Sequence, residues 1–109
     1  MIVYDHPLDG RRWTLEVKDD TWVVATPEGS EPYLVEVISE DEQRVRRGRK
    51  TWPVFVRQYG VSRCGCTWAR KNYRRIYRGV ARCPHQIAGH LASLAVDGIL
   101  VERPEEVKA

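Results

Sequence analysis

Apolar and polar residues alternate along the first third of the chain in the way that is typical of antiparallel strands. In WTLEVK, which begins at Trp13, every second residue is apolar, and TWVVAT and YLVEVIS repeat this alternation. An Asp-Asp pair and the loop TPEGSEP separate the three segments as turn signals. Residues 11–39 therefore predict a three-stranded antiparallel meander, with Glu16 and Glu36 on the face opposite its apolar side chains.

The alternation is lost over residues 41–51, where the charge changes from acidic to basic. This segment predicts a linker or the exposed end of a hairpin. The strand pattern then returns in WPVFVRQYGVSRC. It predicts a strand around Pro53–Val56, a turn at Tyr59-Gly60 and a second strand that ends at Cys64.

Helical spacing replaces the alternation in the last third of the chain. Residues 67–78 predict a short basic helix, with Gly79 as its end. Its apolar positions are Ala69, Tyr73, Ile76 and Tyr77. A second helix is predicted from Pro84 to Asp97-Gly98. Its apolar stripe is Ile87, Leu91, Leu94 and Ala95. The ILVE segment at residues 99–102 predicts an edge strand before a polar tail.

Length and composition bound the class of protein. A chain of 109 residues fits one domain with a thin hydrophobic core, so an additional cross-link would help it to fold. No apolar run approaches the roughly 20 residues that cross a bilayer, and the first residues do not resemble a signal peptide. Three cysteines are an odd number, which favours reduced thiols over a disulfide framework. We expect an intracellular protein, cytoplasmic or nucleoid-associated, without membrane contact.

Charge is strongly segregated along the sequence. Residues 1–42 hold eleven acidic and three basic residues, whereas residues 43–96 hold thirteen basic residues and no Asp or Glu. This segregation indicates a polyanionic partner for the basic middle of the chain. The alternative is internal neutralisation, in which the acidic first third folds against the basic middle.

All three cysteines and one histidine lie in one short segment, as Cys64, Cys66, Cys83 and His85. Thiolates and imidazole are the ligands of tetrahedral structural zinc sites. Side chains at i and i+2 of a flat strand stand about 6–7 Å apart, so the chain must curl, and Gly65 is suited to a positive φ at this point. Cys83 is expected just before the second helix and His85 in its first turn.

His90 is an alternative fourth ligand. Its distance of five residues from His85 turns it about 140° further round the helix, beside the apolar stripe, where a packed histidine is the more usual role. A hydrolytic zinc needs an open coordination position and a nearby general base. Since four ligands fill the site and residues 43–96 contain no acid, we expect neither an enzyme nor a small-molecule substrate.

The pattern Cys-x-Cys followed by Cys-x-His resembles the SWIM zinc finger. The order of strand, turn, strand, Cys-x-Cys, intervening segment, Cys-x-His and helix over residues 53–96 is similar to the SWIM layout. The resemblance implies a structural zinc on the four ligands and a module that binds DNA or proteins. The expected fold class is α+β, with an N-terminal antiparallel β meander followed by a zinc-bound ββα SWIM-like unit.

The corresponding division of the chain has four parts. These are an acidic β-rich region at 1–40, a basic linker or hairpin end at 41–51, the SWIM-like unit at 52–98, and a C-terminal strand with a polar tail at 99–109. The sixteen residues between Cys66 and Cys83 depart from the family, because this part of other SWIM segments is often shorter or more acidic. We therefore expect the basic insert to carry this protein's own specificity.

Nucleic acid, DNA in preference to RNA, is the expected partner of the basic segment, because Lys and Arg neutralise phosphates and release counterions. The candidates in the insert and beside it are Arg63, Arg70, Lys71, Arg74, Arg75, Arg78 and Arg82. Arg47-Gly48-Arg49 resembles the core of an AT-hook and adds Arg47 and Arg49. The flanking prolines of that motif are missing, so a solvated basic turn is the alternative.

Aromatic residues interleave with these charges and would suit stacking on single-stranded bases. They are Trp52, Tyr59, Trp68, Tyr73 and Tyr77. Core packing is the more common role of aromatic residues in a small domain, and it is the expectation here.

Two classes of function compete. The first is a zinc-stabilised nucleic-acid-binding module with a regulatory or accessory role. The second is a protein-interaction adaptor, or a small viral inhibitor, that uses the zinc unit as a docking scaffold. The two differ in whether the basic residues form one exposed stripe or are matched by the acids of residues 1–42.

Overall fold

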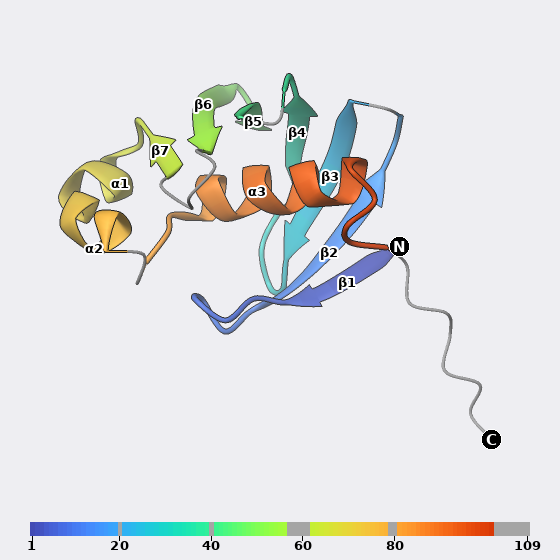
Figure 1. Ribbon diagram of the computed structural model, residues 1–109, viewed down its shortest axis with the longest axis horizontal. Helices are drawn as coiled ribbons and strands as arrows, with labels where there is room; N and C mark the ends of the chain where they lie inside the picture. Colours follow the sequence, from blue (N-terminus) through green and yellow to red (C-terminus); the bar gives the residue numbers. More distant parts are fainter. Residues whose placement is uncertain (20, 40, 57–61, 79–80, 102–109) are drawn as a thin grey trace.

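In the computed structural model, the described residues form an antiparallel sheet of seven strands, crossed on one face by a long helix (Figure 1). The structure describes residues 1–19, 21–39, 41–56, 62–78 and 81–101. The strands lie in the sheet in chain order: β1 (Ile2–Asp5), β2 (Arg12–Val17), β3 (Trp22–Pro27), β4 (Tyr33–Val37), β5 (Glu42–Arg47), β6 (Lys50–Val56) and β7 (Ser62–Cys64). The helices are α1 (Thr67–Lys71), α2 (Tyr73–Tyr77) and α3 (Pro84–Val96).

The predicted meander over residues 11–39 is confirmed as β2, β3 and β4. Leu15 lies opposite Ala25, and Val23 lies opposite Val35, so apolar side chains of adjacent strands meet on one face. All four are fully buried. The period-two pattern was sufficient here because only one face of each strand is covered by α3.

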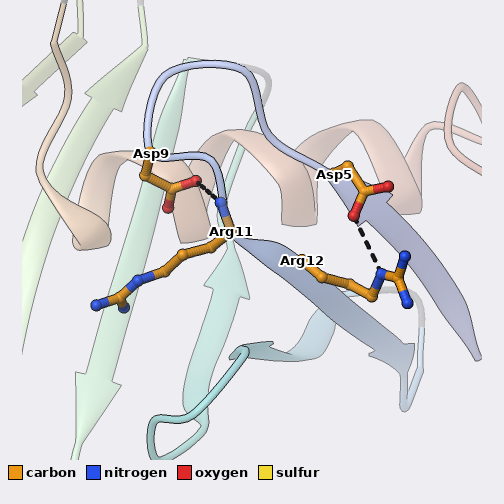
Figure 2. A network of polar contacts seen from close by, with 4 residues as sticks. All are labelled: Asp5, Asp9, Arg11 and Arg12. Atoms are coloured by element: carbon orange, nitrogen blue, oxygen red, sulfur yellow. Dashed lines mark hydrogen bonds and ion pairs between the residues drawn. The ribbon is translucent and has the colours of Figure 1, made fainter.

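The first strand, β1, is an addition to the predicted meander. The loop that joins it to β2 is held by Asp9, whose two carboxylate oxygens accept hydrogen bonds from the Arg11 backbone and the Trp13 indole, both at 2.9 Å. Arg12 pairs with Asp5 of β1 at 3.1 Å (Figure 2). Asp9 therefore fixes Trp13, the largest fully buried side chain, in the core.

Residues 42–47 form a strand where a linker was an option, so the linker prediction is wrong. The turn between β5 and β6 lies at Gly48, whose φ of +59° favours glycine, and only this part fits the exposed hairpin end. Gln43 is fully buried on β5, and its side-chain amide donates a hydrogen bond of 2.7 Å to the Ser93 hydroxyl of α3. A glutamine at a core position interrupts the alternation of apolar and polar residues that marks a strand. Its burial becomes understandable only when the helix that accepts its hydrogen bond is known.

The second predicted helix is confirmed as α3, which packs against β2 to β7. Cys83 is its N-cap and Pro84 follows in the first turn, where a missing N–H costs nothing. Gly98 ends it with a φ of +75°. Fourteen buried residues form the main core: Ile2, Trp13, Leu15, Val23, Ala25, Tyr33, Val35, Val45, Val54, Ile87, Ala88, Leu91, Ala92 and Ala95.

The first predicted helix is divided at Asn72, and its predicted apolar face is only half right. Ala69 of α1 and Ile76 of α2 are buried, as expected. Tyr73 and Tyr77 instead point to solvent, with 61% and 77% of their surface exposed. The break at Asn72 interrupts the regular rotation, so the spacing of one continuous helix no longer decides which residues face inward.

The predicted edge strand is wrong over residues 99–101, which form no strand. The backbone N–H groups of Ile99 and Leu100 donate to the Leu94 carbonyl and so close the end of α3. The predicted turn at Tyr59-Gly60 and the helix end at Gly79 lie outside the described residues. Within the described part of the chain, no helix has the length and apolar character needed to span a bilayer.

Candidate metal centre

The end of β7 and the start of α3 bring the four predicted ligands together. One donor atom from each of Cys64, Cys66, Cys83 and His85 lies within 4.8 Å of the others. Cys64 ends β7, Cys66 precedes α1, and Cys83 with His85 begins α3. The predicted pairing of a strand end with a helix start is therefore present.

The distances in this cluster fit a tetrahedral ion. His85 Nδ1 lies 3.6 Å from Cys64 Sγ and 3.8 Å from Cys83 Sγ. With metal–sulfur bonds of about 2.3 Å and metal–nitrogen bonds of about 2.0–2.1 Å, the ligand atoms of a tetrahedron are about 3.5–3.8 Å apart. The three thiols and the imidazole could thus hold a metal ion with little movement.

Two of the sulfurs are also helix caps. Cys83 Sγ accepts a hydrogen bond from the Gln86 backbone at 3.4 Å, and the Gln86 side chain accepts one from the Cys83 backbone at 2.8 Å, which completes a capping box. Cys66 Sγ accepts from the Ala69 backbone at 3.3 Å at the start of α1. Each N–H donor acts to lower the pKa of the sulfur that it contacts, although burial and the neighbouring Cys64 outweigh this effect when no metal is bound.

The curl between the first two thiols does not use the predicted conformation. Among the described residues, positive φ angles occur at four other glycines, and Gly65 is not one of them. Cys66 instead leaves the line of β7 in the extended conformation of a helix N-cap, with φ of −72° and ψ of 160°. The start of α1 turns the chain, so the expectation of a left-handed Gly65 is wrong.

Without a metal, the three thiols share their charge unequally. A hydrogen bond from the Cys83 thiol, with a further one from His85, lowers the pKa of Cys64 to about 4. The hydrogen bond to Cys64 and burial raise the pKa of Cys83, and burial raises that of Cys66. Cys64 is therefore the thiol that ionises most readily, and metal binding must displace the protons that the other thiols still carry.

An aromatic pair holds the His85 ring. The Trp52 ring stacks on it with centroids 3.8 Å apart and an interplanar angle of 24°, and Tyr33 meets it edge-on at 5.5 Å. The sequence predicted core packing for Trp52, with base stacking as the alternative, and it gave Tyr33 no role at the metal site. The sequence did contain a signal for Trp52. Residues two apart on a strand share a face of the sheet, so Trp52 lies on the same face as Val54, and Val54 pairs with Cys64.

We expect Trp52→Ala to weaken metal binding by about 10–100-fold, the usual cost of removing a group that orients a metal-bound histidine. Loss of the stacked indole frees rotation of the His85 side chain. Competition with a chromophoric chelator measures the affinity. Phe55→Ala is the matched control, since Phe55 lies on the same strand with 44% of its surface exposed. Equal affinity of the two variants would remove the orienting role.

His90, the alternative ligand, lies apart from the cluster. Its Nδ1 is 3.1 Å from Nη1 of Arg82, and burial, with the charge of Arg82, lowers the pKa of His90 to about 4. His6 is buried as well, and its Nδ1 accepts a hydrogen bond from the Leu8 backbone. Of the histidines, His85 is the one grouped with the three sulfurs.

The predicted nucleic-acid contacts divide into two groups. The exposed group on α1, α2 and their ends, named the insert cluster here, is Arg70, Lys71, Arg74, Arg75 and Arg78. Arg49 is also exposed, in the hairpin turn, and Arg63 lies on β7. The others have partners within the fold. Arg82 is half-buried beside His90, and the guanidinium of Arg47 lies 3.8 Å over the Tyr33 ring.

Internal neutralisation is limited in the described residues. Arg44 and Glu36, 3.3 Å apart, form the ion pair that links the basic middle to the acidic first third. The other described ion pairs, Arg12 with Asp5 and Lys18 with Glu16, lie within the first third itself. No member of the insert cluster forms an ion pair with a described residue.

Arg47 shows why the AT-hook resemblance does not extend to its side chain. Arg47 donates hydrogen bonds of 2.9 Å to the Ser30 hydroxyl and the Glu31 carbonyl, so its guanidinium is held against β4 and the preceding loop. An arginine that enters a minor groove must extend from its turn.

Comparison with known proteins adds no relative to these observations: no family model, no curated protein and no solved structure matches this chain.

Proposed function

We propose that this chain is a zinc-binding module of SWIM type, in which a structural zinc on Cys64, Cys66, Cys83 and His85 presents a basic insert to nucleic acid. The observation that carries the proposal is the position of the insert cluster. Its five basic side chains are exposed on α1, on α2 and at the end of α2, in the segment that joins Cys66 to Cys83. A regulatory or accessory role, without catalysis, is part of this proposal.

Zinc is the metal that the donor set favours. Three thiolates and an imidazole in a tetrahedron are typical of structural zinc, whereas magnesium and calcium require oxygen ligands. Two of the four ligands, Cys66 and Cys83, are buried, which suits a structural ion. Four protein ligands leave no open position for substrate, so we propose no hydrolytic chemistry.

The insert depends on this ion for its shape. Each of α1 and α2 has five residues, far fewer than the roughly 12–15 that an isolated helix needs to be even marginally stable. Their buried cluster contains Cys66, Ala69, Ile76 and Cys83, two of which are metal ligands. A zinc ion would therefore hold the five basic side chains in place on a thin core.

DNA phosphates are the proposed contacts of the insert cluster. Exposed Lys and Arg without acidic neighbours neutralise phosphates and release counterions, which makes affinity fall steeply with salt. Residues 43–96 contain no Asp or Glu to repel the backbone. We expect sequence-independent affinity in the micromolar range at moderate salt, because phosphate contacts carry no sequence information by themselves.

Replacing Arg74 and Arg75 with Gln tests this proposal. Each lost phosphate contact is expected to reduce the slope of log affinity against log salt by about 0.9 for duplex DNA, so the double variant should lose about 1.8. Fluorescence anisotropy with a labelled duplex at several salt concentrations measures the slope. The matched control is the double variant Arg11→Gln and Lys18→Gln, which loses the same charge in the acidic third. A slope that changes equally in both variants would contradict the proposal.

A protein-interaction adaptor is the second candidate, and the outer face of the sheet favours it. In the described residues, the helix α3 covers one face of the sheet and no helix packs on the other. Val3 and Phe55 lie on that outer face with 43% and 44% of their surface exposed. Absence of any binding to duplex or single-stranded DNA at low salt would leave this second candidate.

A further inference from the structure

We propose that the insert binds single-stranded DNA, with Tyr73 and Tyr77 stacking on bases while the neighbouring arginines contact phosphates. The inference rests on the proposed function, because it names the form of nucleic acid that the same insert takes. The inference rests on the exposure of these two aromatic side chains, which the sequence pattern predicted to be buried.

The insert concentrates the exposed aromatic residues of the chain. Four aromatic side chains are exposed in the described residues, and three of them belong to the insert: Trp68, Tyr73 and Tyr77. The fourth, Phe55, lies on β6. A ring with most of its surface in solvent contributes little to folding, since its stabilisation scales with the area buried. These rings are therefore available to a ligand.

The two tyrosines form one strip on α2. Residues four apart are neighbours on a helix surface, with Cβ atoms about 5–6 Å apart and a rotation of about 40° between them. Ile76, between them in sequence, turns inward to the cluster of Cys66 and Cys83. Packing of Ile76 thus fixes the strip at the surface.

Arginines border this strip on the side away from the core. A rotation of about 100° per residue places Arg74 about 60° beyond Tyr77, with Arg78 next to it. Arg74 Nε donates a hydrogen bond of 3.3 Å to the Tyr73 hydroxyl, and its guanidinium carbon lies 5.8 Å from the ring centroid. An aromatic row therefore runs beside a cationic row, on the same helix.

Single strands match this arrangement better than duplexes do. The flat faces of duplex bases are covered by their neighbours, whereas a single strand offers bases to aromatic rings and phosphates to adjacent cations. Each helix of the insert has about one and a half turns, which is short for reading a major groove. Base stacking and phosphate contacts do not require a ribose 2′-hydroxyl, so single-stranded DNA supplies every contact that the proposal uses.

The experiment compares a labelled oligo-dT strand of about 15 nucleotides with a duplex of the same length, by fluorescence anisotropy at low salt. We expect the zinc-loaded chain to bind the strand more tightly than the duplex. The double variant Tyr73→Ala and Tyr77→Ala should bind the strand about 30-fold more weakly, because stacking is worth about 1–3 kcal/mol per base. Its duplex affinity should change by less than about twofold.

Two further variants separate stacking from general damage. Tyr73→Phe with Tyr77→Phe keeps both rings and should retain strand binding, whereas Phe55→Ala removes an exposed ring outside the insert and should leave binding unchanged. Zinc content, measured on every variant, should stay at one equivalent, since neither tyrosine contributes to the buried cluster.

Each outcome bears on a separate claim. This inference is overturned if the wild-type chain binds the duplex more tightly than the strand. It is also overturned if the double alanine variant binds the strand as tightly as the wild-type chain does. Either result leaves the proposed function in place. Failure to bind either ligand at low salt would overturn the proposed function itself. An oligo-U strand bound about tenfold more tightly than oligo-dT would overturn the assignment to DNA.

Discussion

Removal of the metal, or the substitution Cys66→Ser, is expected to unfold the insert between Cys66 and Cys83 while the sheet and α3 stay folded. The insert and the main sheet each have their own cluster of buried side chains, and Cys64 at the end of β7 packs against both clusters. The cluster under the insert contains four buried side chains, of which Cys66 and Cys83 are candidate metal ligands. The main core contains fourteen buried residues and none of the ligands. Loss of the metal therefore removes the proposed cross-link between two of the four buried side chains on which the insert packs.

The expected effect on the insert is large. Zinc contributes about 10–16 kcal/mol of apparent binding free energy to finger peptides at neutral pH, which exceeds what two helices of five residues can supply. In Cys66→Ser, α1 also loses the sulfur that caps it through the Ala69 backbone. We expect backbone amides in the insert to exchange with solvent as in an unfolded chain.

Hydrogen exchange followed by mass spectrometry, with and without a chelator, measures this difference along the chain. Elemental analysis should give one equivalent of zinc in the wild-type chain and much less in Cys66→Ser. Thr67→Ala is the control, because Thr67 is an exposed neighbour of the ligand on α1. Unchanged protection of the insert after complete metal removal would refute the idea of a metal-dependent insert, and loss of protection in α3 would refute the separation of the two cores.

The substitution Leu91→Ala is expected to destabilise the whole domain by about 2–5 kcal/mol, with zinc content unchanged. Leu91 lies in α3 with 1% of its surface exposed, and this helix packs against β2 to β7. Truncation leaves a cavity between the helix and the sheet that the surrounding strands fill only in part. Because α3 supplies five of the fourteen core residues, the loss is shared by the entire sheet.

Urea unfolding followed by circular dichroism measures the free energy of unfolding for this variant. Leu8→Ala is the matched control, since Leu8 is the same residue type in the loop before β2 with 38% of its surface exposed, and its effect should stay within about 0.5 kcal/mol. Similar unfolding midpoints for the two variants would contradict a central position of Leu91. Loss of zinc in Leu91→Ala would show that the metal centre depends on the main core.

The features that could be predicted are those in which a few neighbouring residues decide the outcome. Alternation alone was enough for β2, β3 and β4, because each has one covered face and a turn at each end. Pro84 and Gly98 marked the bounds of α3 for local reasons, a missing N–H at one end and a left-handed φ at the other. The four candidate ligands were recognisable because zinc demands particular donor types and few other roles explain three cysteines and a histidine at this spacing.

The remainder depended on partners that are distant in the sequence. Gln43 is a core residue, and its amide donates a hydrogen bond to Ser93, which lies fifty residues away in the chain. His85 is held by Trp52 because α3 packs against β6, and Tyr33 lies under the guanidinium of Arg47 because β4 and β5 are neighbours in the sheet.

The sequence by itself thus determined the donor set, the basic character of the insert and the meander, since these follow from residue type and local spacing. Tertiary structure alone decided which aromatic rings are buried and which are offered to solvent. At Tyr73 and Tyr77 a short helix broken at Asn72 packs through Ile76 and leaves both rings outside. The physical reason is that the buried side of a helix is selected by the surface it packs against, and that surface is built from side chains far away in the chain.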